Sequence, residues 1–125
     1  MVIHQPPEVL HNMSEWCKVN FAESGLLDQI KQSTITTKQA EQLMIDFITP
    51  YIVPGQCPLA GNSIHMDKRF IDAEMPNFSK LLHYRLVDVS TIKELARRWY
   101  PKEFAEAPQK KGKHRALDDI KVRFY

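Results

Sequence analysis

The stretch CPLAGNSIHMDKRFIDAEMPNFSKLLHYRLVDV, residues 57–89, decides the fold because it reads as a strand, a helix and a second strand. Residues 57–63 form a short apolar run ending in turn residues, which is typical of a buried strand that leads into a loop. A helix is predicted to begin near Met66 and to be broken before Pro76. Residues 85–89 then predict the second strand. This succession indicates the α/β class.

Helices are predicted on the N-terminal side of this unit. Residues 8–24 carry apolar side chains at every third position and end at Gly25, which indicates one or two short helices. The clearest helix follows, because Thr36 and Gln39 form the pattern of a capping box. Its apolar side chains recur with helical spacing on one stripe: Ala40, Leu43, Met44, Phe47, Ile48 and Tyr51.

A further helix and a linker are predicted on the C-terminal side. Residues 90–99 carry a T-x-x-E pattern at the start of the helix, and Pro101 closes it. Residues 101–113 read as a polar linker. Two strands, with a possible strand end at residues 2–3, are few for a sheet beside so many helices. The domain is therefore either mostly helical or lacks part of its sheet.

The composition is that of one soluble globular domain over residues 1–125. The chain is 43% hydrophobic and 26% charged, and its net charge of only +2 does not indicate a polyanionic partner. No apolar run approaches the roughly 20 residues of a membrane span, and the first residues resemble neither a signal nor a transit peptide. Cys17 and Cys57 lack a CxxC partner, which favours a reducing compartment over a zinc site. We therefore expect an intracellular protein without membrane contact.

Two aspartates and one histidine are the candidates for chemistry. Asp67 follows the loop after the 57–63 strand, and Asp119 lies one turn into a helix after the basic run at residues 110–115. Carboxylate oxygens are the ligands that Mg²⁺ prefers. On a continuous helix, His114 and Asp119 would be rotated by about 140° from each other, so they converge only if His114 lies in the preceding loop. An imidazole there suits a general base, although H-x₄-D also occurs by chance and at ordinary helix starts.

Four segments together resemble the oligoribonuclease family of DEDDh 3′–5′ exonucleases. They are NMSEWCKVNFAESGL (12–26), GNSIHMDKRFIDAEMPNF (61–78), LHYRLVDVSTIKELARRWYP (82–101) and HRALDDI (114–120). The resemblance covers roughly residues 2–121 in the family's order and spacing. It implies a ribonuclease H-like α/β fold, a homodimer, and two Mg²⁺ or Mn²⁺ ions that serve the hydrolysis of very short RNA to mononucleotides.

The resemblance also implies roles for single residues. Asp67 and Asp119 match metal-binding carboxylates, and His114 matches the general base. Tyr84 matches an active-site tyrosine that the family contributes across the homodimer interface. Trp16 matches the aromatic residue that stacks on a base. The positions that match a cap on the 5′-phosphate of the substrate are Ser63, Arg85 and Ser90.

Several of these residues have a plain structural alternative. Trp16 could be a core residue on an amphipathic helix, and Tyr84 could be an ordinary aromatic before a strand. Arg85 could pair with a surface carboxylate, and Ser90 could cap a helix. Asp88 is assigned to solvent or local structure. The histidines without an assigned role are His4, His11, His65 and His83.

The sequence departs from the family's pattern at both ends. The family begins with a strand that carries D-x-E, whereas residues 2–6 here resemble the tail of its third strand, and residues 122–125 do not match. We therefore expect a domain truncated at the N-terminus and at the C-terminus, in which the 57–63 strand has an open edge. The expected function is a 3′–5′ exoribonuclease of the cytoplasm or mitochondria. The alternative is an inactive fragment that binds short RNA or dimerises with a full-length paralogue.

Overall fold

The computed structural model describes residues 1–107 and divides the chain into two compact units. Residues Met1–Val89 form the first unit, and the second begins at Ser90. Within the described residues no helix combines the length and apolar character that crossing a membrane requires. His114 and Asp119 lie outside the described residues, so their expected meeting stays a prediction, as does the single domain over residues 1–125.

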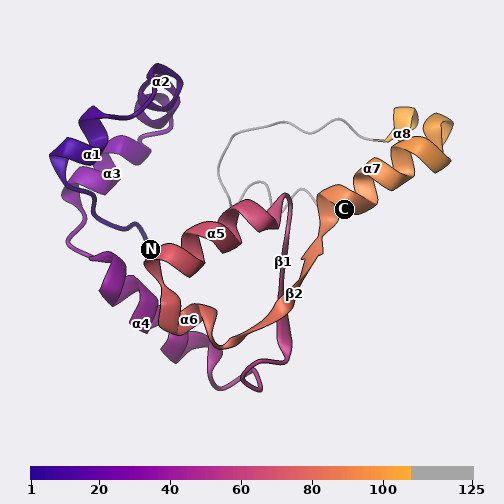
Figure 1. The fold of residues 1–125 in the computed structure, drawn as a ribbon. Helices are drawn as coiled ribbons and strands as arrows, with labels where there is room; N and C mark the ends of the chain where they lie inside the picture. Colours follow the sequence, from indigo (N-terminus) through magenta and orange to yellow (C-terminus); the bar gives the residue numbers. More distant parts are fainter. Residues whose placement is uncertain (108–125) are drawn as a thin grey trace. The chain divides into compact units, whose positions relative to one another are not determined.

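A strand–helix–strand unit forms the centre of the first unit, as the sequence predicts. Strand β1 (Cys57–Gly61) and strand β2 (Leu82–Asp88) run parallel, and α5 (Ile64–Glu74) and α6 (Pro76–Ser79) connect them. Figure 1 shows the two strands side by side with α5 beside them. The α/β class is confirmed for the described residues, and the connection is the helical crossover that parallel strands require.

Strand β1 differs from its prediction in its burial. The sequence favours a buried strand over residues 57–63, yet its residues alternate between half-buried and exposed positions. Leu59 pairs with Leu86, and Gly61 pairs with Asp88. Because β2 lies on only one side of β1, the described residues bury too little surface around this strand to enclose it. The expectation that strands are missing from the sheet stays a prediction.

The chain begins with three short helices: α1 (Pro7–His11), α2 (Glu15–Glu23) and α3 (Leu26–Gln32). The Ser14 hydroxyl accepts a hydrogen bond from the Cys17 amide and caps α2. Gly25 has a φ of 69°, and from this left-handed conformation the chain turns directly into α3. The short helices predicted over residues 8–24 are confirmed, and the sequence analysis missed α3.

Helix α4 (Thr37–Ile48) begins at the predicted capping box. The Thr36 hydroxyl accepts a hydrogen bond from the Gln39 amide at 3.2 Å, while the Gln39 side chain accepts one from the Thr36 amide at 2.9 Å. The apolar stripe of this helix is only partly covered, since Ala40 is fully buried whereas Phe47 is 67% exposed. The stripe therefore predicts the helix correctly but not a fully buried face.

A buried carboxylate joins α4 to α6. Glu41 is only 6% exposed, and its Oε1 accepts hydrogen bonds from the backbone amides of Asn77 at 2.6 Å and Phe78 at 3.1 Å. These amides belong to the first turn of α6, where backbone donors lack partners inside the helix. Phe78 is buried at this junction, and with Ala40 and Ile64 it forms the small apolar core of the described residues. Glu41 therefore fixes α6 with a charge-assisted cap.

A second polar cluster links α5 to the end of α6. The Asp72 carboxylate accepts hydrogen bonds from the Lys68 ammonium and the Ser79 hydroxyl, and Lys68 also donates to Ser79 at 3.1 Å. The hydrogen bond from Lys68 and that from Ser79 hold the pKa of Asp72 below its ordinary value of 3.8. Because this cluster joins residues on both helices, it holds the corner between them.

The second unit contains two described helices. Helix α7 (Val89–Trp99) begins at the last residue of the first unit, and α8 (Pro101–Glu106) follows it. Glu94 accepts hydrogen bonds from Arg98 at 2.6 Å and Arg97 at 3.0 Å, which lower the pKa of Glu94. The predicted linker at residues 101–113 is wrong over residues 101–106, because Pro101 occupies the first position of a helix, where proline is well tolerated.

Replacement of Glu41 by alanine is expected to lower the free energy of unfolding by about 2 kcal/mol, because two backbone donors would lose a charged acceptor in a buried place. Glu41→Gln keeps one acceptor oxygen and should cost less. Urea unfolding followed by circular dichroism measures both. Glu23→Ala, on an exposed residue at the end of α2, is the control. Equal stability of Glu41→Ala and Glu23→Ala would contradict this account of the junction.

The pKa of Asp72 is expected to rise toward 3.8 in a Lys68→Met variant, because the largest cause of its lowering is removed. A carboxyl with a lowered pKa in the folded state stabilises the protein above its ordinary pKa and loses this effect as the pH falls through the folded value. Asp72→Asn should therefore be less stable than the parent chain at pH 7 but equal to it at low pH. Carbon-detected NMR titration measures the pKa, and an unchanged value in Lys68→Met would refute the assignment.

Candidate functional site

The loop after β1 is tied to the end of β2 by one carboxylate. Asp88 Oδ1 accepts a hydrogen bond from the Ser63 amide at 2.9 Å, and Asp88 Oδ2 lies 3.3 Å from His65 Nδ1. Ser63 has a φ of 46°, a left-handed conformation that is unusual for a residue other than glycine. The hydrogen bond that the Ser63 amide donates to Asp88 helps to hold this conformation. The sequence assignment of Asp88 to local structure agrees with these contacts.

The end of β1 is closely packed at Gly61. A Cβ atom on Gly61 would lie 2.7 Å from the Ile64 Cδ1 atom, and Ile64 is buried at the start of α5. The loop of residues 61–63 can therefore turn tightly into α5 without a steric clash. This turn sets the direction in which α5 leaves the sheet.

Asp67 lies in the first turn of α5 and its residue is exposed to solvent. It follows the carboxyl end of β1, the edge of a parallel sheet at which polar side chains of α/β proteins gather around ligands. A carboxylate at a helix start is also favoured by the helix dipole. Within residues 1–107 no three side chains of the His, Cys, Asp or Glu types lie close enough together to hold a metal ion. The described residues thus contribute Asp67 alone of the predicted metal ligands.

Strand β2 presents a cluster of ring and cation side chains. The Tyr84 residue is 78% exposed, and its ring stacks on the His83 ring with 4.4 Å between centroids. The Arg85 guanidinium lies 5.5 Å from the Tyr84 ring centroid, within the range of a cation–π interaction. The Arg85 amide donates to His83 Nδ1 at 3.0 Å, which places the proton of a neutral His83 ring on Nε2.

Two of the plain alternatives differ from what the structure shows. Tyr84 lies within β2 rather than before a strand, and the side-chain contact of Arg85 is with an aromatic ring rather than a surface carboxylate. The active-site roles of both residues stay predictions. His83 received no role from the sequence, although it directly precedes the predicted tyrosine. Neighbouring ring residues on a strand normally point to opposite faces, so their sequence alone gave no sign of the stacking.

Trp16 lies in the first turn of α2 and is 57% exposed. The alternative that it is a core residue is therefore wrong, and its role in base stacking stays a prediction. Ser90 is the second residue of α7, because the helix begins at Val89 rather than at the predicted start. Ser90 thus lies within the first turn of the helix instead of preceding it as a cap. Of the predicted site residues, Ser63, Asp67, Tyr84 and Arg85 belong to the strand–helix–strand unit.

Comparisons with known proteins give the same family as the sequence motifs. The model of the exonuclease family (RNase_T) matches residues 1–125. A mitochondrial oligoribonuclease of Homo sapiens is 56% identical over 120 residues, which are 96% of this chain and 51% of the human protein. A probable oligoribonuclease of Dictyostelium discoideum is 49% identical over 120 residues, 62% of its length. An oligoribonuclease of Marinobacter nauticus is 48% identical over 121 residues, 67% of its length.

The chain spans about half the length of the human relative and two thirds of the bacterial one. The match to the family model extends over the whole chain, and the identity to each of these relatives is nearly half or more. The chain therefore belongs to the exonuclease family and, within it, to the oligoribonucleases.

Proposed function

We propose that this chain is the substrate-binding and partly catalytic portion of a 3′–5′ exoribonuclease that degrades very short RNA to mononucleotides. The observation that carries the proposal is the match of 96% of the chain to proteins named oligoribonuclease at up to 56% identity. The strand–helix–strand unit supports it, because Asp67, Ser63 and Asp88 all lie at or after the carboxyl ends of its parallel strands.

The proposed metal ligands are Asp67 and Asp119, with His114 as the general base. The exposed Asp67 carboxylate offers the hard oxygen atoms that Mg²⁺ or Mn²⁺ prefers. A pair of such ions, when bound, supplies an activated water and stabilises the leaving oxygen. Because residues 1–107 hold no group of three ligands, the site needs carboxylates from elsewhere in addition to Asp67.

The proposed substrate contacts explain a preference for short RNA. Trp16 and Tyr84 are exposed rings on which bases can stack without regard to sequence. Arg85 and the hydroxyls of Ser63 and Ser90 are suited to binding a 5′-phosphate. Phosphate contacts at the far end of the substrate would close the site, so that a longer chain does not fit. His83 and Arg85 both contact the Tyr84 ring.

Assembly and compartment follow from the same proposal. A homodimer would let Tyr84 of one copy serve the site of the other, which suits a ring that is 78% exposed on its own chain. Mitochondria are the proposed compartment, with the cytoplasm as the second, since the human relative is named a mitochondrial oligoribonuclease.

A second function is favoured by one specific observation. The described residues carry two exposed aromatic rings, Trp16 and Tyr84, on which bases can stack. Such a chain would bind short RNA without cleaving it, or would dimerise with a full-length paralogue and lend it Tyr84. The assay below separates these functions.

Cleavage of a 5′-phosphorylated diribonucleotide in the presence of Mn²⁺ is expected to stop when a chelator is added. Asp67→Asn should lower the rate by at least roughly a hundredfold. Even the mutation of a residue that only hydrogen-bonds to a metal ligand lowers metal affinity or activity by up to that factor. Asp28→Asn, on an exposed residue of α3, is the control and should leave the rate unchanged. Binding without cleavage by the parent chain would support the second function, and chelator-resistant cleavage would contradict the metal ligands.

Trp16→Ala is expected to weaken binding of the same dinucleotide roughly tenfold, since one base–aromatic stack is removed. Trp16→Phe should restore part of the affinity because a ring remains. The measurement is a fluorescence or calorimetric titration without divalent ions. Trp99→Ala provides a matched control, because Trp99 is an exposed tryptophan at the end of α7. An equal loss in both variants would argue against a stacking role for Trp16.

A further inference from the structure

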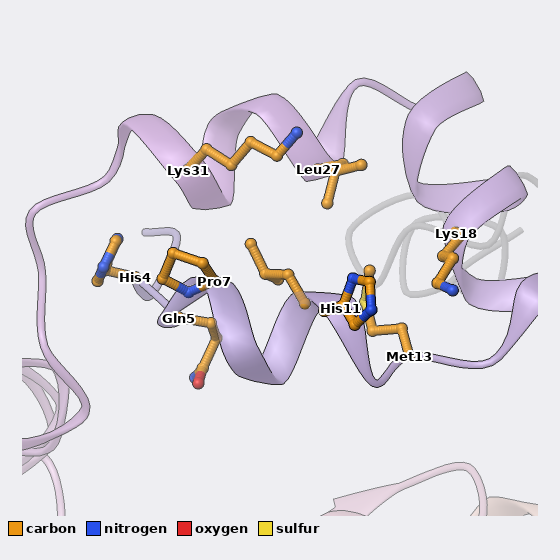
Figure 2. A pocket seen from close by; sticks show the side chains of 9 residues that line it. His4, Gln5, Pro7, His11, Met13, Lys18, Leu27 and Lys31 are labelled. Atoms are coloured by element: carbon orange, nitrogen blue, oxygen red, sulfur yellow. The ribbon is translucent and has the colours of Figure 1, made fainter.

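A cavity of about 580 Å³ lies among the first three helices. Figure 2 shows Pro7 and His11 of α1 on one side, Leu27 and Lys31 of α3 on the other, and Lys18 of α2 at one end. Cavities of this size hold small molecules, with an apolar surface and a few polar groups that orient the ligand. None of the site residues discussed above lines this cavity.

The lining combines apolar side chains with nitrogen-bearing ones. Leu10 and Leu27 contribute apolar surface, whereas Lys18, Lys31, His4 and His11 contribute amines and imidazoles. Among the described residues that line the cavity there is no carboxylate. The charge of the lining is therefore positive, and it is complementary to a small anion that also carries an apolar or flat body.

The two lysines are engaged to different extents. Lys18 is held by Glu15 through an ion pair of 2.8 Å, and the Glu15 side chain is 86% exposed. Lys31 forms no ion pair within residues 1–107. An anion in the cavity would therefore meet Lys31 directly and would compete with Glu15 for Lys18. On the opposite side, the carbonyl oxygen of Ile30 lies 3.3 Å from His4 Nδ1, which fixes the orientation of that ring.

The cavity uses a different face of α2 from the proposed stacking residue. Trp16 and Lys18 are two positions apart, which corresponds to a rotation of about 200° around a helix. Lys18 lines the cavity whereas Trp16 does not. A molecule bound among α1, α2 and α3 would thus contact α2 on a face away from Trp16, while it would hold the helix that carries that ring.

We propose that this cavity binds a nucleoside monophosphate, with its phosphate beside Lys31 and Lys18 and its base against Leu10 and Leu27. The choice of a nucleotide rests on the proposed function, because a mononucleotide is the product of that reaction. The anionic group and the flat body follow from the lining itself. Bound product would stabilise α2 from the face opposite to Trp16 and so couple product concentration to substrate stacking.

The test is isothermal titration of the 125-residue chain with AMP, adenosine and inorganic phosphate, each in the presence of EDTA. AMP is expected to bind at least roughly tenfold more tightly than adenosine or phosphate alone, because both parts of the ligand are recognised. Lys31→Ala should weaken AMP roughly tenfold, while Lys38→Ala, on an exposed lysine of α4 outside the cavity, should not. Glu15→Gln should strengthen AMP binding, since it removes the competing carboxylate from Lys18.

Three outcomes would overturn the proposal: no AMP binding, equal binding of AMP and adenosine, or equal affinities of the Lys31→Ala and Lys38→Ala variants. Circular dichroism checks that each variant is folded, and both lysines are exposed enough for substitution to be tolerated. Because EDTA removes divalent ions and Asp67→Asn leaves the cavity intact, AMP binding in that variant separates this site from the nuclease site. AMP binding by a parent chain that shows no nuclease activity would reject the proposed function alone.

Discussion

The carboxylate of Asp88 is the constraint on which the candidate site depends. It accepts the Ser63 amide and approaches His65, and so it joins the end of β2 to the loop after β1 across 25 residues of sequence. With Gly61 packed against Ile64, this link fixes where α5 starts and hence where Asp67 stands. This hydrogen bond at the carboxyl ends of the two strands thereby helps to position the residue proposed to hold the metal.

Two further polar contacts in the first unit hold the helices that connect β1 to β2. Glu41 caps α6 from α4, and the Lys68–Asp72–Ser79 cluster holds α5 to α6, so the crossover between the parallel strands is fixed at both of its helices. The apolar core is small, with Ala40, Ile64 and Phe78 as its buried members among the described residues. Polar contacts therefore share in orienting the elements. The strongest of them is at Glu41, because its charged acceptor is buried, whereas the Lys68–Asp72 pair is more exposed and contributes less.

The sequence predicts features that depend on neighbouring residues, but it does not predict contacts between residues far apart in the chain. The capping box at Thr36 and Gln39 and the break before Pro76 depend on a few neighbouring residues, so both were predicted. Helix α3 was missed because Gly25, taken as a stop, begins the next helix in a left-handed conformation. The exposure of β1, the stacking of His83 on Tyr84 and the link from Asp88 to Ser63 arise from contacts between distant or oppositely directed residues. Composition and spacing carry no record of such contacts.

The central claim is that Asp67, His114 and Asp119 meet around shared divalent ions. Anomalous scattering from a crystal grown with Mn²⁺ and a non-hydrolysable dinucleotide tests it most directly. The account predicts a manganese peak about 2.1 Å from a carboxylate oxygen of Asp67, with Asp119 as a further ligand and the His114 ring within reach of the scissile phosphate. Manganese bound away from Asp67, or the three side chains on separate surfaces, would contradict it.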